Sequence, residues 1–181
     1  MIIGITGTNG AGKGTVVEYL KTKWFIHFSA RTFFIEEIKR RGLPINRDTI
    51  TEVANDLRVK FGTGYFTEQA LARLGSGSSD AVIESIRTPG EAEYLKAKGA
   101  LLWAVDADIH TRYDHAILRG SETDKISFEK FVADEQREWS NDDPTKQNLK
   151  AVIDTADVIL TNNGTQEELF AQVEAALHDR K

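Results

Sequence analysis

The stretch "GITGTNGAGKGT", Gly4 to Thr15, holds five glycines in twelve residues and directly follows the apolar start "MII". Within it, Gly7 is followed after four residues by Gly12 and Lys13, and another glycine stands directly after the lysine. This spacing matches the phosphate-loop pattern except at that last glycine, where serine or threonine is usual. Backbone N–H groups can surround a polyphosphate only where side chains neither hold the backbone away nor forbid the required dihedral angles. The stretch therefore predicts a strand, a phosphate-binding loop and a helix, in that order.

The residues of this loop have expected parts in holding a nucleoside triphosphate. The helix that begins near Lys13 presents the positive end of its dipole, and the Lys13 ammonium reaches the outer phosphates. Thr15, one place later than the usual hydroxyl, would serve the magnesium shell. The plainer interpretation, a glycine-rich turn with an incidental lysine, fits less well because strand, spacing, lysine and helix all agree. The predicted nucleotide-binding residues are Thr8, Asn9, Gly10, Ala11, Gly12, Lys13, Gly14 and Thr15.

Five short apolar runs alternate with helix-length segments along the chain. The runs are "MIIGIT", "WFIHF", "AVIE", "ALLWAV" and "DVILT". Alternation of this kind indicates a parallel sheet that is covered by helices on both faces. Two helices that follow strands begin with capping-box sequences, "TPGE" at Thr88 to Glu91 and "TQEE" at Thr165 to Glu168. We expect an α/β fold, the three-layer P-loop NTPase fold with a five-stranded parallel sheet.

Composition indicates a single domain with the balance of an ordinary globular protein. The 181 residues are 40% hydrophobic and 28% charged. No stretch approaches the roughly 18 apolar residues that a membrane span needs. The N-terminus enters a strand without a signal-peptide pattern, so we expect a cytoplasmic protein that meets no membrane. The net charge of −5 argues against a broad nucleic-acid surface.

Several residue types that could carry other chemistry do not form a site. The chain has no cysteine, which excludes disulfides, thiolate zinc sites and a thiol nucleophile. The four histidines show no paired spacing beside carboxylates, so no protein-built metal site is expected. Asp106 and Asp108 end a strand and begin a helix, where one would cap and the other would be solvated. The tryptophans stand in apolar patterns, and we expect Trp24, Trp103 and Trp139 in or near the core.

Two segments depart from the alternating pattern and are candidates for contact with substrates. Residues 29–78, between the second and third apolar runs, hold helical patterns and predict a helical acceptor-binding insertion over the sheet. From Asn46 onward, one buried stripe repeats at helical spacing: Ile50, Val53, Ala54, Leu57 and Phe61. The polar stretch "LRGSETDKIS", Leu118 to Ser127, joins two helices and gives a candidate lid over residues 119–127. Both segments belong to one predicted P-loop domain, residues 1–181.

Three classes of protein share the phosphate loop: switch GTPases, ATPase motors and small-molecule kinases. The chain has neither an Asp three residues before a glycine nor an Asn-Lys-x-Asp sequence, which GTPases need. It also lacks the apolar strand ending in Asp-Glu that is typical of motors. A kinase remains, and a kinase needs a second site for the acceptor and a lid that excludes water.

The loop "GTNGAGKGT" resembles the adenylate-kinase form, in which a glycine follows the lysine. Beyond the loop the chain resembles the P-loop nucleoside monophosphate kinase family, and more closely small archaeal adenylate-kinase-related or dephospho-CoA-kinase-like proteins. The resembling pieces span most of the chain and are "EEIKRRGLPINRDTITEVANDLRVKFG", "VIESIRTPGEAEYL", "DKISFEKFVADEQRE" and "ADVILTNNGTQEEL". The resemblance implies a kinase that uses ATP and Mg²⁺.

The resemblance also implies roles for residues beyond the loop. Glu84 stands where the family commonly has aspartate, near the magnesium and its waters. Arg87 matches an arginine near the acceptor phosphate, and its alternative is a surface cap. Arg58 either points into the acceptor cleft or lies on a solvated helix face. Asn163, in "TNNGT", would lie along the adenine edge, or else it belongs to an ordinary strand-to-helix turn.

Some positions depart from the family pattern. Ile35 stands where adenylate kinases carry an acceptor-binding arginine, which makes Arg31 the candidate substitute. Arg119 matches a lid arginine that turns onto the transferring phosphate, or it is a surface charge. His115, four residues earlier on the same helical face, replaces an arginine that stacks on the adenine. Ser121 stands where the archaeal group tends to carry another arginine, so we expect weaker stabilisation of transition-state charge.

The sequence predicts a phosphotransferase that moves the γ-phosphate of ATP to a small acceptor, with a nucleoside monophosphate as the first candidate. The alternatives are a dephospho-CoA kinase and an ATP-binding ATPase or regulatory module without kinase activity. The predicted partner is a small-molecule nucleotide, and the sequence leaves monomer or homodimer, strict ATP preference and the acceptor's identity open. The predicted site consists of Lys13, Arg119 and Arg87 as catalytic residues, Arg31, Arg58 and Arg87 for the acceptor, His115 and Asn163 for the nucleotide, and Thr15 and Glu84 for magnesium.

Overall fold

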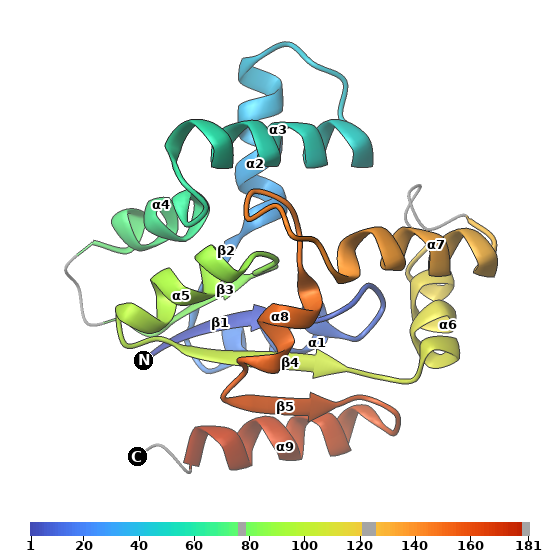
Figure 1. Cartoon of the computed structure of the whole chain (residues 1–181). Helices are drawn as coiled ribbons and strands as arrows, with labels where there is room; N and C mark the ends of the chain where they lie inside the picture. The colour runs from blue at the N-terminus through green and yellow to red at the C-terminus, as the bar shows by residue number, and fades with distance from the viewer. Residues whose placement is uncertain (76–78, 121–125, 179–181) are drawn as a thin grey trace.

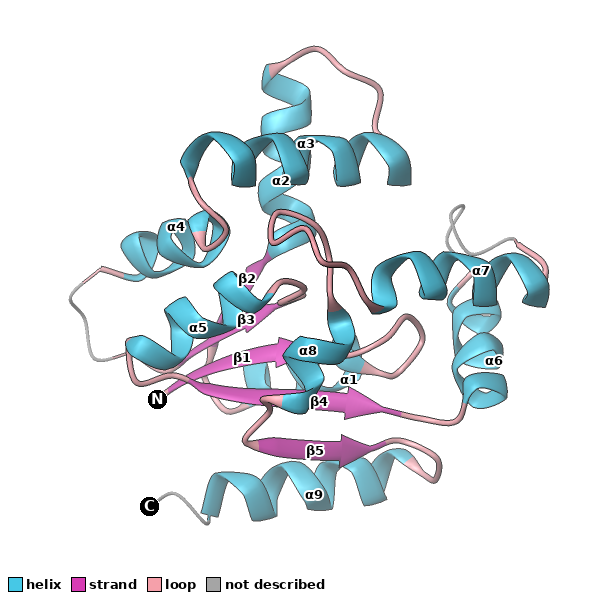
Figure 2. Ribbon diagram, viewed as in Figure 1, coloured by secondary structure: helices cyan, strands magenta, loops and turns pink. Residues whose placement is uncertain are grey.

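The computed structural model describes residues 1–75, 79–120 and 126–178. Within these residues the centre is a five-stranded sheet in the order β2-β3-β1-β4-β5, and neighbouring strands are parallel (Figure 1, Figure 2). Each strand overlaps one predicted apolar run, so the predicted parallel sheet is confirmed. The strands are β1 (Ile2–Thr6), β2 (Ile26–Ser29), β3 (Ala81–Glu84), β4 (Leu101–Asp106) and β5 (Val158–Thr161).

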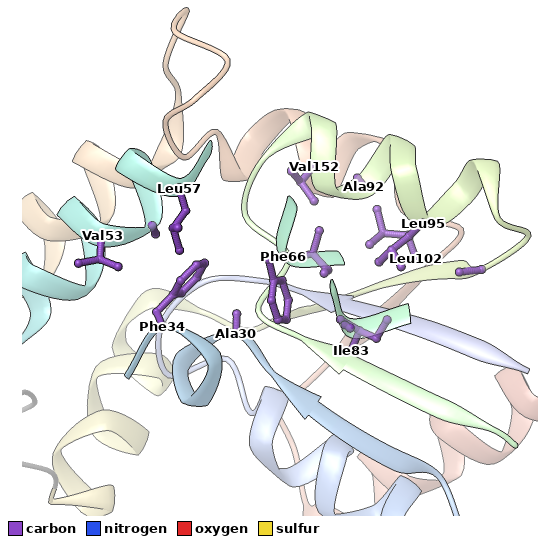
Figure 3. Packing of buried hydrophobic residues seen from close by; sticks show 14 of the residues in the cluster. Ala30, Phe34, Val53, Leu57, Phe66, Ile83, Ala92, Leu95, Leu102 and Val152 are labelled. Atoms are coloured by element: carbon purple, nitrogen blue, oxygen red, sulfur yellow. The ribbon is translucent and has the colours of Figure 1, made fainter. Parts of the chain in front are cut away.

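Helices cover both faces of the sheet, and each face has its own apolar cluster. Successive strand residues point to opposite faces. Val82 therefore packs with Leu20 and Val173 on one face, whereas Ile83 packs with Leu95 on the other (Figure 3). Because β3 is buried on both faces, its sequence is a continuous apolar run rather than an alternating one. The helices on the first face are α1 (Lys13–Thr22) and α9 (Gln166–His178), and those on the second include α5 (Pro89–Ala97) and α8 (Leu149–Asp154).

The chain between β2 and β3 forms helices α2 (Ala30–Arg40), α3 (Arg47–Phe61) and α4 (Tyr65–Leu74). Figure 1 shows α2 and α3 standing out from the rest of the molecule. The apolar stripe of α3 is buried at Val53, Ala54 and Leu57 and packs around Phe34 (Figure 3). The stripe was predicted to reach Phe61, and this is wrong, because that side chain is 58% exposed. Phe61 is the last residue of the helix, and its ring stacks instead on Tyr65 with centroids 4.7 Å apart.

Helices α6 (Ile109–Arg119) and α7 (Phe128–Trp139) flank the predicted lid. They pack together through rings, since Phe128 stacks on His110 at 4.8 Å and Phe131 meets Tyr113 edge-on at 5.6 Å. Residues 121–125 of the lid, which include Ser121, lie outside the described residues. The role of residues 119–127 as a lid stays a prediction.

The predicted helix caps are confirmed. Thr88 and Glu91 form a capping box at the start of α5. Thr165 and Glu168 exchange the same pair of hydrogen bonds before α9. Asp108 caps α6 by accepting the backbone N–H of His110, while Asp106 is exposed.

The tryptophan prediction is only partly right. Trp103 of β4 is fully buried, whereas Trp24 and Trp139 are 89% and 39% exposed. Trp24 occupies the turn after α1 with a left-handed φ of 71°. Its neighbour Phe25 supplies the buried ring, so the apolar pattern begins one residue later than the sequence indicated. In the part of the chain that the structure describes, no helix combines the length and apolar character needed to cross a membrane.

Candidate active site

The loop between β1 and α1 is closely packed by other elements. Gly7 and Gly12 have φ of 132° and 97°, values that residues with a Cβ rarely adopt. A Cβ at Gly7 would overlap the carbonyl of Val105, and one at Gly12 would overlap the side-chain amide of Asn162. The first N–H groups of α1 have no partner within the helix. This corner therefore has the backbone features of a phosphate-binding loop.

Lys13, the first residue of α1, bends back over the loop. Its Nζ donates to the carbonyls of Gly7, at 2.9 Å, and Thr8, at 2.7 Å. Burial, together with the nearby Arg87 and Arg119, lowers the pKa of Lys13 to about 7, although Glu84 and Glu138 act in the opposite direction. A lysine in this state gains most from an incoming polyanion, which would favour its charged form.

A cavity lies on each side of Lys13. The first, of about 980 Å³, lies over the phosphate loop, α6 and the turn after β5, and we name it the loop cavity. The second, of about 370 Å³, lies between the loop, the carboxyl end of β3 and helices α2 and α3, and we name it the insertion cavity. Lys13, Glu84 and Arg119 line both. The two cavities therefore meet at a lysine, a carboxylate and an arginine.

The loop cavity gathers most of the predicted nucleotide-binding residues. His115 Nδ1 lies 3.0 Å from the Gly10 carbonyl, and Arg119 donates from Nη2 to Asn9 Oδ1 at 3.1 Å. Both helix α6 side chains therefore lie against the phosphate loop, and Thr8 and Ala11 are buried within the loop. The predicted residues that line this cavity are Gly10, Gly12, Lys13, Gly14, Thr15 and His115.

The turn after β5 contributes to the same cavity through residues other than Asn163. Asn162 and Gly164 line the cavity. Asn163 is exposed, and its Oδ1 accepts the backbone N–H of Asp108 at 2.7 Å. Asn162 is buried and donates from Nδ2 to the Ala11 carbonyl at 3.1 Å. The sequence analysis identified the correct turn, but Asn162 rather than Asn163 contacts the phosphate loop.

Glu84, at the end of β3, lies 3.0 Å from His27 Nε2. Burial acts to raise the pKa of Glu84, but His27, Lys13 and Arg87 outweigh it and hold the pKa below its usual value. Glu84 therefore presents a charged carboxylate to both cavities. The partnership with His27 of β2 was not predicted, although parallel pairing of β2 and β3 puts the two residues on adjacent strands.

In the insertion cavity, Arg87 contacts an acidic residue that the sequence analysis missed. Arg87 donates from Nη1 to Glu138 of α7 and, at 2.9 Å, to Gln147 Oε1. Glu138 also accepts from Arg47 Nη2 at 2.8 Å, at the start of α3. Burial acts to raise the pKa of Glu138, but Arg87 and Arg47 lower it to about 2. A charged carboxylate thus lies between two arginines in this cavity.

Arg58 lines the insertion cavity, but its guanidinium has a structural partner. Its side chain is 4% exposed, so the interpretation as a solvated helix face is wrong. Nη2 donates to Glu91 Oε1 at 2.8 Å, and the other oxygen of Glu91 accepts the backbone N–H groups of Arg87 and Thr88. Arg58 therefore ties α3 to the start of α5. Arg31, by contrast, is exposed at the cavity wall.

Residues of α7 and α6 support the site in ways that the sequence did not reveal. Arg112 is buried, donates from Nε to the Ala107 carbonyl at 2.8 Å and pairs with Glu135 through Nη2 at 3.0 Å. Its Nη1 also reaches the carbonyl of Asn9 in the phosphate loop, at 3.5 Å. The sequence pattern that could have indicated these acidic residues of α7 is the run "ADEQRE". This run fits a solvated helix face equally well.

Comparisons with known proteins agree with this fold. The chain is 27% identical over 180 residues to a UPF0200 protein of Thermococcus kodakarensis, covering 96% of this chain and 94% of the relative. Its structure is similar to shikimate kinase from Aquifex aeolicus, with a TM-score of 0.54, 16% identity and coverage of 99% and 98%. It is also similar to a gluconokinase from Sinorhizobium meliloti, with a TM-score of 0.59, 11% identity and coverage of 98% and 91%. No family model matches the chain.

The chain therefore has an α/β fold of the P-loop kinase type, as the sequence predicted. The similarity to shikimate kinase and gluconokinase extends over nearly the whole chain. The name of the archaeal relative states no activity.

Proposed function

We propose that the protein is an ATP- and Mg²⁺-dependent phosphotransferase that moves the γ-phosphoryl group of ATP to a small acceptor, with a nucleoside monophosphate as the first candidate. The observation that carries this proposal is the meeting of the loop cavity and the insertion cavity at Lys13, Glu84 and Arg119. A donor in one cavity and an acceptor in the other would face each other at these groups. Holding two reactants in this way supplies much of a transfer enzyme's rate acceleration.

The loop cavity takes the nucleotide in this proposal. Backbone N–H groups of the phosphate loop and of the α1 N-terminus hold the phosphates. Lys13 exchanges its contacts with the Gly7 and Thr8 carbonyls for phosphate oxygens. His115 and the turn at Asn162 flank the nucleoside.

During transfer, the bond between the γ-phosphorus and the oxygen bridging to the β-phosphate breaks, and an acceptor oxygen bonds to the phosphorus. Lys13 and Arg119 neutralise the charge that develops. Arg87 and Arg31 orient the acceptor in the insertion cavity. Arg58 shapes that cavity through its pair with Glu91 rather than by binding the acceptor.

Magnesium fits the oxygen donors that face the loop cavity. Among the described residues, no group of three His, Cys, Asp or Glu side chains is placed to hold a metal ion by itself. Thr15 and Glu84 both line the loop cavity and offer a hydroxyl and a carboxylate, the donor types that Mg²⁺ prefers. Mg²⁺ bound with ATP would neutralise charge on the phosphate oxygens.

One observation favours a second candidate function, an ATP-binding ATPase or regulatory module. Arg87 and Arg58, two of the three predicted acceptor residues, are each paired with a glutamate. If these pairs persist when nucleotide is bound, no acceptor phosphate can reach them.

One assay separates these candidates. ADP formation is followed with ATP and Mg²⁺, alone and with nucleoside monophosphates, dephospho-CoA, shikimate or gluconate. ADP release stimulated by one acceptor, with a phosphorylated product, supports the kinase and names its acceptor. Acceptor-independent release supports the ATPase, and binding without turnover supports the module. The Lys13→Ala variant is the control and should abolish every active outcome.

A further inference from the structure

The insertion cavity is rich in positive charge. Among the described residues, six basic side chains and two acidic ones line it. One of the two acidic residues is Glu84, at the end of β3, which contacts His27 of β2. The other, Glu138, is 13% exposed and lies between Arg87 and Arg47. Arg31 is exposed at the same wall, and no ion pair joins it to the rest of the described chain.

Arg87 and Arg47 converge on one carboxylate from separate parts of the fold. Arg87 follows β3, and Arg47 begins α3. Arg47 donates to Oε1 of Glu138 at 2.8 Å, and Arg87 donates to Oε2. Guanidinium groups that meet in this way also suit a phosphate, whose oxygens accept the same planar donors and which carries more charge than a carboxylate. The geometry is that of an anion site with a carboxylate in place.

We infer that Glu138 is a specificity-determining residue of the insertion cavity: its carboxylate occupies the position between Arg87 and Arg47 that a phosphate group of the acceptor takes, and the acceptor binds by displacing it. This inference rests on the proposed function, because it treats the insertion cavity as the acceptor site. An acceptor without an anionic group gains little from the displacement, since the half-buried guanidinium groups of Arg47 and Arg87 would exchange a charged carboxylate for a neutral group. Glu138 thus selects for phosphorylated acceptors and against neutral ones.

The position of Glu138 in α7 is compatible with this displacement. It is the residue before the last of the helix, and Trp139 and Ser140 beyond it are exposed. Asp134, one turn earlier, lies 3.7 Å from Arg47 and is also paired with Arg137 at 2.8 Å. Contacts between α7 and α3 therefore remain when the Glu138 side chain moves away.

Protonation does not release Glu138 near neutral pH. Burial works against its charge, but the two arginines hold the pKa at about 2. The carboxylate stays ionised, so a competing anion must displace it as a charged group. This competition lowers the affinity of every anion for the site, and removing the carboxylate should raise it.

Phosphate binding tests the inference without requiring catalysis. Purified protein is saturated with ADP to occupy the phosphate loop and is then titrated with inorganic phosphate in a calorimeter. We expect Glu138→Gln to bind phosphate about tenfold more tightly than the unaltered chain, a change of about 1.4 kcal/mol in binding free energy. The double variant Glu138→Gln/Arg87→Gln should lose this gain. Acetate should bind Glu138→Gln at least about tenfold more weakly than phosphate does, and equal binding would overturn the assignment to phosphate.

Glu37→Gln is a matched control. Glu37 also accepts hydrogen bonds from two arginines, Arg40 and Arg41. These arginines lower its pKa to about 2. It lies on α2 and does not line either cavity. Its variant should bind phosphate like the unaltered chain. Unchanged or weaker phosphate binding in Glu138→Gln would overturn the inference. Glu138 would then either hold the two arginines in position or bind a hydroxyl group of the acceptor.

Two further measurements keep the test decisive. If Glu138→Gln does not fold, the side-chain Nε–H signals of Arg87 and Arg47 are followed by NMR in the unaltered chain during the same titration. They should shift together, and their constancy would contradict displacement. If ADP does not bind, the donor part of the proposed function fails by itself, and the titration is repeated in Lys13→Ala without nucleotide.

Discussion

Asn162, in the turn after β5, donates from its side-chain Nδ2 to the Ala11 carbonyl across 3.1 Å and so fixes the phosphate loop to the end of β5, an edge strand of the sheet. The side chain is buried, and it also fills the space that a Cβ at Gly12 would need. A contact between residues 151 positions apart thus sets the shape of the loop.

We predict that Asn162→Ala weakens both the fold and the loop. The Ala11 carbonyl would lose its partner, which costs about 1–2 kcal/mol in unfolding free energy. The affinity for ATP should fall by about tenfold or more, because the loop amides lose their fixed positions. Urea denaturation and ATP titration measure the two effects.

Gln172→Ala is the control for this prediction. Gln172 also bonds backbone groups of the β5 end, Thr161 N and Thr161 O, but it does not line the loop cavity. Its loss should lower stability while leaving ATP affinity unchanged. Equal ATP affinity in both variants would contradict the role of Asn162.

Lys13 should take up a proton when a polyphosphate binds. Its pKa of about 7 means that much of it is neutral at pH 8, and phosphate oxygens beside it would raise the pKa again. Calorimetry of ATP binding at pH 8 in buffers of different ionisation enthalpy should show uptake of up to about one proton. Lys13→Met should show none from this source, and a result independent of the buffer in the unaltered chain would refute the prediction.

The same lysine predicts how stability depends on pH. Because its pKa falls from 10.5 to about 7 on folding, the unfolded chain binds more protons in that window. The contribution of Lys13 to unfolding free energy therefore rises as pH increases from about 7 to 10.5. The unfolding free energy of the unaltered chain should therefore rise over that window relative to that of Lys13→Met. Urea denaturation of both chains at several pH values measures this change.

Breaking the buried pair of Arg58 and Glu91 should be costly. Their side chains are 4% and 1% exposed, and Glu91 also accepts two backbone N–H groups at the start of α5. Removing one partner of a buried pair costs about 3–5 kcal/mol, so Glu91→Ala should lower unfolding free energy by that amount. Glu93→Ala, on an exposed position of the same helix, should change it by less than about 0.5 kcal/mol. Similar midpoints in urea for the two variants would count against this account.

Glycines of the phosphate loop should differ in their tolerance of alanine. Gly12→Ala meets both a left-handed φ of 97° and the Asn162 amide, and it should lose at least about 1–2 kcal/mol of stability. A Cβ at Gly14 meets nothing within 4 Å, and this glycine lies in α1. Gly14→Ala should therefore gain up to about 1 kcal/mol. Thermal unfolding of the two variants compares them, and a loss in Gly14→Ala would contradict the open space described there.

The sequence predicted the sheet well because its signals are local. A parallel strand that is buried on both faces must be apolar throughout, and the capping boxes at Thr88 and Thr165 need only four consecutive residues. Burial at the ends of elements was less predictable. Trp24 and Phe61 continue apolar patterns past the point where the backbone turns away from the core.

The candidate site was predictable only where one segment carries the whole motif. The phosphate loop is such a segment, and helix α1 begins at Lys13 as expected. Arg87 was identified, but its partner Glu138 lies 51 residues away on α7, and no local pattern reports that meeting. Arg58 was placed on the correct helix, and only the fold shows that Glu91 takes up its charge.

Helix α7 touches both halves of the site with side chains three residues apart. Glu135 holds Arg112, which reaches the phosphate loop at Asn9, and Glu138 holds the arginines of the insertion cavity. A shift or rotation of this twelve-residue helix must move both contacts at once. A change in α7 that alters one cavity would therefore alter the other, so in the proposed kinase acceptor choice and nucleotide affinity would change together.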